Sequence, residues 1–299
     1  GIPAAEAAKK ADTVLAIETE LAKGSLDVTS RRDPTKLVHK YKTADLAALT
    51  PAFDLHKYFV GLDTPAFSTL NVAVPDFFRA MNSTIENRSL DELKDYLAWQ
   101  YTTSRANKLA KPFLDETFDF YGRILTGAEK QRPRWKRCVA STDGYIGEAI
   151  GQRYVEQTFG KEGKQRTLDM VHQIERAMSA DIDAITWMSD DTKKEAFLKL
   201  KGVTNKIGYP DKWRDYSTLT ILPGDYVGNV NRADAFEVAR HMRRIGQPVD
   251  RNEWEMTPPT VNAYYDPQQN NINFTAGILQ PPFYSNKADD AVNAGAIGD

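Results

Sequence analysis

The strongest constraint on the fold comes from segments in which apolar residues recur every three or four positions. Ser89 and Glu92 have the spacing of a capping box, in which each side chain bonds a backbone N–H group at the start of a helix. Leu93, Tyr96 and Leu97 follow on one face of the helix that this box begins. The same periodicity predicts further helices over residues 5–23, 146–160, 168–187, 190–202 and 232–245. A mainly α-helical chain is therefore expected.

Glycines and polar caps mark the ends of several predicted helices. Gly24 ends the first helix, and Ser189 provides an N-cap for the helix that follows it. We expect Gly202 to end that helix in the left-handed conformation. Residues 160–164, Gly-Lys-Glu-Gly-Lys, resemble a phosphate-binding loop only in composition, because they lack a preceding strand and the GK[ST] ending. We interpret them as a turn between two helices.

The clearest β-strand signal of the chain lies near its C-terminal end. Residues 260–265 and 271–275 are rich in strand-forming residues, and the five residues 266–270 between them are turn formers. This pattern predicts a β-hairpin. Upstream of it, residues 210–232 are rich in turn-forming residues, which is typical of a boundary between domains.

The charge balance argues against a nucleic-acid partner. The 299 residues contain 39 Lys and Arg against 41 Asp and Glu, a formal net charge of −2. Lys130–Arg137 is a local basic run that includes Trp135, and such a run can bind nucleic acid. We favour a solvated helix start after Pro133 with Trp135 turned toward the core, because the acidic residues cancel a basic field. No apolar stretch approaches the roughly 18 residues that cross a bilayer, so no membrane span is expected.

Residues that bind metals or act as nucleophiles are scarce. Cys138 is the single cysteine, so the sequence allows no intrachain disulfide and no CxxC metal pair. The four histidines are His39, His56, His172 and His241. None is four residues from another, so the sequence contains no HExxH zinc helix. We therefore expect no metal ligands and no catalytic residues in this chain.

The other chemically active side chains have structural interpretations that we prefer. Cys138 is predicted to be a small buried residue, and His172 and His241 to be hydrogen-bonded histidines beside core positions of their helices. Asp190 and Asp191 are interpreted as a solvated helix cap. A catalytic pair would need two carboxylates in different environments, which sequence spacing does not establish.

The predicted hairpin has both a structural and a functional interpretation. An exposed edge strand can bind an extended peptide as an additional strand. The amide of Asn262 both donates and accepts hydrogen bonds, so it could bond the backbone of such a peptide. The apolar residues between Ile278 and Phe283 could form the floor of a pocket. A hairpin without a ligand is the commoner case.

Several motifs of the chain match one known family in the same order. Near the hairpin these are Val261–Tyr265 and residues 271–284, NINFTAGILQPPFY. Upstream they are Arg134–Cys138, Gly151–Glu156, Thr186–Met188, Thr192–Lys194 and Ile207–Pro210. The motifs resemble those of neprilysin-type zinc metalloendopeptidases. The resemblance covers roughly residues 5–298, although the first hundred residues match only in their general sequence pattern and contain none of these motifs.

The resemblance implies which residues bind substrate. In neprilysin-type enzymes the Asn-Ala pair of this strand binds the substrate backbone. Asn262 and Ala263 correspond to this pair, so the resemblance implies the same role for them. The Ile and Phe of the AGILQPPF motif line the pocket for the residue after the cleaved bond, and they correspond to Ile278 and Phe283. The implied reaction is hydrolysis of internal bonds in short peptides. Zinc polarises the carbonyl and activates water, and a glutamate acts as general base.

The resemblance also implies two domains. Residues 1–225 are expected to form a helical lid domain, and residues 226–299 the first part of a thermolysin-like α+β catalytic domain that opens with the hairpin. The zinc ligands and the general base are expected beyond Asp299, in a C-terminal catalytic segment that would be the partner of this chain. The chain alone is therefore expected to be inactive. The alternative is a non-catalytic helical protein that binds peptides.

The low cysteine content suits a bacterial member of such a family, for which a periplasmic or extracellular location is implied. The position of Cys138 is normally bridged in animal members. Cys138 is therefore expected to be free here, or bonded to the C-terminal segment.

Overall fold

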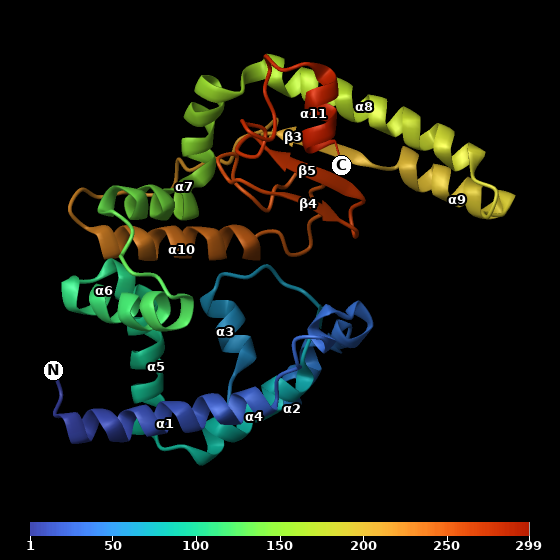
Figure 1. Ribbon diagram of the computed structural model, residues 1–299. Helices are drawn as coiled ribbons and strands as arrows, with labels where there is room; N and C mark the ends of the chain where they lie inside the picture. The colour runs from blue at the N-terminus through green and yellow to red at the C-terminus, as the bar shows by residue number, and fades with distance from the viewer. Residues whose placement is uncertain (299) are drawn as a thin grey trace. The chain divides into compact units, whose positions relative to one another are not determined.

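The computed structural model describes residues 1–298, and it is mainly α-helical, as the sequence predicts (Figure 1). Contacts divide the chain into two compact units. The first combines Gly1–Gln131 with Ile221–Pro248, and the second combines Arg132–Thr220 with the residues from Val249 onward. The predicted division at residue 225 concerns the domains of the family, and it stays a prediction. No helix within residues 1–298 combines the length and the apolarity needed to cross a membrane.

The first unit is built around the long helix α1, which contacts α4 and α5 and buries Ile17 almost completely. Its helices are α1 (Ala4–Lys23), α2 (Leu46–Leu49), α3 (Leu55–Gly61), α4 (Pro75–Asn87), α5 (Leu90–Arg105), α6 (Lys111–Thr117) and α10 (Tyr226–Met242). A π-helix, Phe118–Ile124, follows α6. The strands β1 (Lys40–Lys42) and β2 (Thr69–Asn71) pair antiparallel. Besides the core beneath α1, the first unit has a second hydrophobic core, which lies next to this small sheet and consists of Leu46, Leu49, Leu55 and Val72.

The predicted capping box at the start of α5 is confirmed. The Glu92 backbone N–H donates to Ser89 Oγ at 3.3 Å, and the Ser89 backbone N–H donates to Glu92 Oε2 at 2.9 Å. Arg88 forms ion pairs with both Glu92 and Glu20, and Glu20 belongs to α1. The cap therefore also helps to join α1 to the junction of α4 and α5.

Helix α10 begins at Tyr226, six residues before the predicted start at residue 232. Asp225 explains the difference, because its carboxylate accepts a hydrogen bond from the Gly228 N–H at 3.1 Å and caps the helix. Val230 and Ala233 are the buried residues of α10. Arg105 of α5 bonds Asp234 at 2.5 Å, which fixes α10 within the first unit.

The second unit combines four helices with a three-stranded sheet. The helices are α7 (Arg134–Thr158), α8 (Gly160–Ala184), α9 (Asp190–Lys201) and α11 (Asp290–Ile297), and the strands are β3 (Thr204–Gly208), β4 (Ala263–Asp266) and β5 (Asn271–Thr275). Helix α7 begins after Pro133, as expected, and bends at Ile146, whose backbone is non-helical. Gly160 turns the chain into α8 with φ +64°, so the turn is shorter than the predicted 160–164.

The predicted hairpin is confirmed as β4 and β5, with residues 267–270 as the turn between them. Two parts of the prediction need correction. Residues 260–262 precede the strand, and Asp266 belongs to it. The hairpin also has a third strand, β3, which pairs parallel with β5, so the order is β3-β5-β4 with β4 at an edge (Figure 1).

Four side chains that were expected against or beside the core are exposed: Trp135, Cys138, His172 and His241. The His241 ring is nevertheless hydrogen-bonded as predicted, with its Nε2 atom 2.9 Å from the Arg240 guanidinium. Trp135 and Cys138 lie in the first part of α7, before the bend at Ile146, and the buried residues of α7 all follow that bend. His172 is next to buried Val171 but about 100° further around α8, so its side chain reaches solvent. A position next to a core residue in sequence is thus not itself a core position.

Gly202 ends α9, but with φ −84° rather than in the predicted left-handed conformation. Its N–H donates to the Leu198 and Lys199 carbonyls, so the last turn closes without a positive φ. The side-chain amide of Asn270 donates to the Lys199 carbonyl at 2.8 Å, which caps the same end of α9 from the hairpin turn.

Candidate functional site

The three-stranded sheet has one apolar face. Ile207 of β3 and Ile272 and Phe274 of β5 point to the same side, because alternate residues of a strand share a face. They pack in a core with Val155 and Phe159, which come from the C-terminal end of α7 and the turn after it. This core fixes the position of β5, the central strand of the sheet.

The opposite face of the sheet is polar and largely buried, which no sequence pattern had indicated. Lys206, Asn273 and Tyr264 form one row across β3, β5 and β4. Lys206 Nζ donates to the Glu253 carbonyl at 2.8 Å, and the Glu255 N–H donates to the Tyr264 hydroxyl at 2.9 Å. Burial lowers the pKa of Lys206 and raises the pKa of Tyr264. These bonds attach the segment before the hairpin to the sheet.

The free edge of the sheet belongs to β4, where the predicted peptide-binding residues lie. Within residues 1–298, β4 pairs only with β5. Asn262 immediately precedes β4 and is exposed, and Ala263 is the first residue of the strand and is half-buried. The Asn262 side-chain oxygen accepts a hydrogen bond from the Ala263 N–H at 2.8 Å. This bond orients the amide and leaves its NH₂ group as the donor available to a ligand.

Thr275 holds the backbone that leads into β4. Its side chain is fully buried on β5. The hydroxyl donates to the Asn262 carbonyl at 2.9 Å and also contacts the Thr260 carbonyl. One buried hydroxyl therefore fixes the backbone on both sides of Val261, and with it the position of the Asn262 amide.

Close backbone packing around Gly277 holds the same segment from the other side. The Gly277 N–H donates to the Pro258 carbonyl at 2.8 Å. A Cβ atom added at Gly277 would overlap the carbonyl oxygens of Pro259 and Thr260. Only glycine lets the two backbones approach this closely.

Two glycines of α7 pack against Thr257 and Pro258, where the segment that leads into β4 begins. A Cβ atom at Gly147 would overlap Thr257, and one at Gly151 would lie 2.9 Å from the ring of Pro258. Thr257 Oγ1 also donates to Asp143 Oδ1 at 2.8 Å. Sequence reasoning missed this framework, although Gly147 and Gly151, four residues apart on one helix face, were a usable signal for close packing.

The two predicted pocket residues lie in the turns that follow β5. Ile278 is half-buried and packs against the core cluster. Phe283 is 44% exposed, and its N–H donates to the Gln280 carbonyl at 3.0 Å. Ile278 directly follows Gly277, whose backbone packs against Pro258–Thr260, and it lies three residues after Thr275. The ring of Phe283 lies at the surface, between buried Leu279 and buried Tyr284.

The described residues do not provide a zinc site. No group of three or more His, Cys, Asp or Glu side chains within residues 1–298 could hold a metal ion. The histidines fall on separate segments, and His172 and His241 are exposed helix residues.

The sequence and the fold both place the chain in one class of enzymes. The profile for the N-terminal part of Peptidase family M13 matches residues 1–210, and a second profile of Peptidase family M13 matches residues 262–299. The chain therefore belongs to Peptidase family M13. The expected resemblance to neprilysin-type enzymes is confirmed.

Individual relatives agree with this assignment. Endothelin-converting enzyme 1 from Rattus norvegicus is 31% identical over 297 residues, which are 95% of this chain and 39% of that enzyme. Neprilysin-3 from Drosophila melanogaster is 30% identical over 303 residues, again 95% of this chain, and 38% of that protein is covered. The chain thus spans well under half the length of these relatives.

Solved structures give the same result for the fold. A zinc metalloprotease from Mycobacterium tuberculosis, in complex with an inhibitor, matches all of this chain with 39% identity and a TM-score of 0.91. PepO from Lactobacillus rhamnosis matches all of it with 26% identity and a TM-score of 0.89. The chain covers 45% and 48% of those two structures, respectively.

Proposed function

We propose that the protein is a zinc-dependent endopeptidase that cleaves short peptides, and that this chain provides the helical lid and the substrate-binding edge strand. Membership of the peptidase family supports the enzyme class. The observation that carries the role of this chain is the edge of β4. There the exposed side-chain amide of Asn262 accepts a hydrogen bond from the Ala263 N–H, and the buried Thr275 hydroxyl donates to the Asn262 backbone carbonyl. The chain's Asn262, Ala263, Ile278 and Phe283 are the proposed substrate-binding residues.

The edge strand suits an extended peptide. A peptide that lies along β4 continues the order β3-β5-β4 by one strand, so its backbone N–H and C=O groups replace their bonds to water with bonds to the strand. The Asn262 NH₂ group donates to a substrate carbonyl near the start of β4. Because Thr275 and Gly277 fix the backbone before the peptide arrives, little conformational entropy is lost on binding.

Zinc and the residues that hold it belong to the rest of the proposal. When bound, zinc supplies the polarisation of the scissile carbonyl in this class of enzyme. Its ligands are proposed to lie beyond Asp299, in a C-terminal catalytic segment that is the partner of this chain. We further propose a bacterial source, which the single cysteine supports, and a periplasmic or extracellular location, which rests on the family resemblance.

The test uses the natural gene product that contains this sequence, assayed with short peptides with and without a chelator. Asn262→Ala is expected to lower kcat/KM by the equivalent of about 1–3 kcal/mol, because an orienting hydrogen bond is lost. Ile278→Ala and Phe283→Ala should mainly change which residue is accepted after the cleaved bond. Asn286→Ala, at another exposed asparagine of the same unit, is the matched control and should leave kcat/KM unchanged.

An unchanged kcat/KM in Asn262→Ala would remove this residue from the site. Native mass spectrometry of the same gene product addresses the metal, since one bound zinc is expected. A second function, peptide binding without catalysis, is favoured only by the presence of the edge strand without a ligand set in residues 1–298. Peptide binding by the full-length product that is insensitive to chelators and yields no cleavage would support that alternative.

A further inference from the structure

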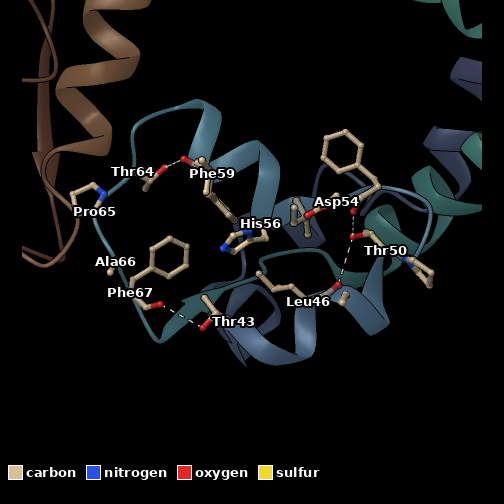
Figure 2. A pocket seen from close by; sticks show the side chains of 15 residues that line it. Thr43, Leu46, Thr50, Asp54, His56, Phe59, Thr64, Pro65, Ala66 and Phe67 are labelled. Carbon is tan, nitrogen blue, oxygen red and sulfur yellow. Dashed lines mark hydrogen bonds between the residues drawn. The ribbon is translucent and has the colours of Figure 1, made fainter.

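The first unit contains a cavity of about 710 Å³ that no part of the proposed function uses. It lies among α2, α3 and the segment Thr64–Phe67 (Figure 2). A volume of this size falls within the range of about 300–1,000 Å³ that small-molecule sites occupy. The cavity is therefore large enough to enclose a ligand of two or three rings.

The walls of the cavity are aromatic and aliphatic. Phe53, Phe59 and Phe67 line it together with Leu46 and Leu55 of the second core. The Phe59 and Phe67 rings already meet edge to face with their centroids 5.0 Å apart. A guest ring that packs beside this pair meets both a ring face and a ring edge, which favours an aromatic guest over an aliphatic one.

The wall hydroxyls are already used by the protein itself. Thr64 Oγ1 donates to the Phe59 carbonyl at 2.6 Å, and Thr50 Oγ1 donates to the Phe53 carbonyl at 3.0 Å. Thr43 Oγ1 donates to the Ser68 carbonyl at 3.2 Å. Each of these hydroxyl groups already donates its one hydrogen bond to a backbone carbonyl, so none can donate to a guest.

His56 is the exception among the polar residues of the wall. Its ring makes no hydrogen bond within residues 1–298, and Figure 2 shows it in the middle of the lining side chains, between α3 and the side chains of Leu46 and Phe67. Asp54, the other ionisable residue of the wall, caps α3 by accepting the Lys57 N–H at 2.9 Å. An imidazole ring offers one donor and one acceptor when neutral.

We propose that this cavity is a binding site for a small, largely apolar aromatic molecule with one polar group, which hydrogen-bonds to His56. The polar group is a hydroxyl or a similar uncharged group, because an anion would lie near the carboxylate of Asp54. His56 and Asp54 lie at the exposed side of the cavity, so the polar group of the guest faces solvent while its ring packs on the apolar wall. A peptide segment is a poorer guest, since this apolar wall offers its several backbone groups few partners. The site lies within the first unit and does not rest on the proposed peptidase function.

The test measures binding of 2-naphthol to the full 299-residue chain by ligand-observed NMR, with 2-methylnaphthalene as the matched compound that lacks the hydroxyl. His56→Leu is expected to weaken 2-naphthol binding about fivefold, the value of one net hydrogen bond, and to change binding of 2-methylnaphthalene by less than about twofold. Ala47→Trp places a large side chain in the wall of the cavity and should weaken both compounds on the order of tenfold or more.

Matched variants distinguish a specific site from surface adsorption. His172→Leu and Ala98→Trp change exposed residues outside this cavity and should leave both affinities unchanged. Circular dichroism of each variant establishes that the fold is retained. The proposal is overturned if Ala47→Trp leaves the affinities for both compounds unchanged. It is equally overturned if His56→Leu changes the affinities for 2-naphthol and 2-methylnaphthalene by the same factor. It is also overturned if the tripeptide Gly-Phe-Gly binds more tightly than 2-naphthol.

Discussion

The segment that leads into β4 and the wall of the α2–α3 cavity use the same hydrogen bond in two different ways. In both, threonine hydroxyls donate to backbone carbonyls: Thr275 to Asn262 in the second unit, and Thr50 to Phe53 in the first. Around Thr275 the neighbours include Gly277, which lets two backbones touch. Around Thr50 the neighbours are phenylalanines, whose rings cannot fill the space between short helices.

The size of the neighbouring side chains therefore decides whether a fixed backbone packs tightly or leaves a cavity. Small neighbours give the tight support of the segment before β4, and large rings leave the hollow between α2 and α3. The support gains precision, because the Thr275 hydroxyl and the close contacts of Gly277 both hold its backbone. The hollow keeps unfilled apolar surface, and such surface is stabilised when a guest covers it.

The largest effect is expected at Gly277. Gly277→Ala should lower the free energy of unfolding by about 3 kcal/mol, because the new methyl group meets backbone carbonyl oxygens that cannot rotate away. Thermal and denaturant unfolding measure the change. Gly295→Ala is the matched control, since a Cβ atom there meets nothing within 4 Å, and alanine should slightly stabilise α11. Equal stability of the two variants would show that the backbones around Gly277 are not closely packed.

A smaller effect is expected when the Thr275 hydroxyl is removed. Thr275→Val keeps the shape of the side chain but leaves buried carbonyl groups without their donor, which should cost about 1–3 kcal/mol of the free energy of unfolding. In the proposed full-length peptidase it should also lower kcat/KM, since the Asn262 backbone loses its support. Thr275→Ser should restore both properties in large part. Lost stability with normal peptide cleavage would separate Thr275 from the positioning of Asn262.

The smallest effect is a pH dependence at the capping box of α5. Hydrogen bonds from Ser89 and Arg88 lower the pKa of Glu92 in the folded chain. The stabilisation is therefore present above the unfolded pKa of about 4.3 and is lost as the pH falls through the lower folded pKa. The stability difference between the wild type and Glu92→Gln should shrink as the pH is lowered from neutrality toward 3. A difference that stays constant over this range would contradict the cap as the cause.

The sequence predicted those parts of the fold that depend on neighbours close in the chain. The capping box of Ser89 and the turn between β4 and β5 are local patterns, and both are observed. Strand β3 was missed because its partner is β5, far along the chain, and because Asn205 and Lys206 do not look like residues of a buried strand. Lys206 is acceptable there because its Nζ donates a hydrogen bond to the Glu253 carbonyl and carboxylates lie nearby.

The candidate site was predicted through resemblance, while its support was not predicted at all. Asn262 was singled out for its amide, but neither its residue type nor its neighbours indicate the buried bond from Thr275. The start of α10 was placed too late because the cap at Asp225 lies within a turn-rich segment. The cavity beside His56 could not be foreseen, since it arises from how aromatic rings of separate segments fail to fill a space.

The parallel pairing of β3 with β5 has a consequence for the chain as it is being made. Strand β3 lies within the part matched by the first family profile, and β5 within the part matched by the second, some 60 residues later. At about 5–20 residues per second, a ribosome exposes β3 several seconds before its partner strand is available. During that interval the backbone groups of β3 bond to water, so the three-stranded sheet of the second unit forms only after β5 has been made.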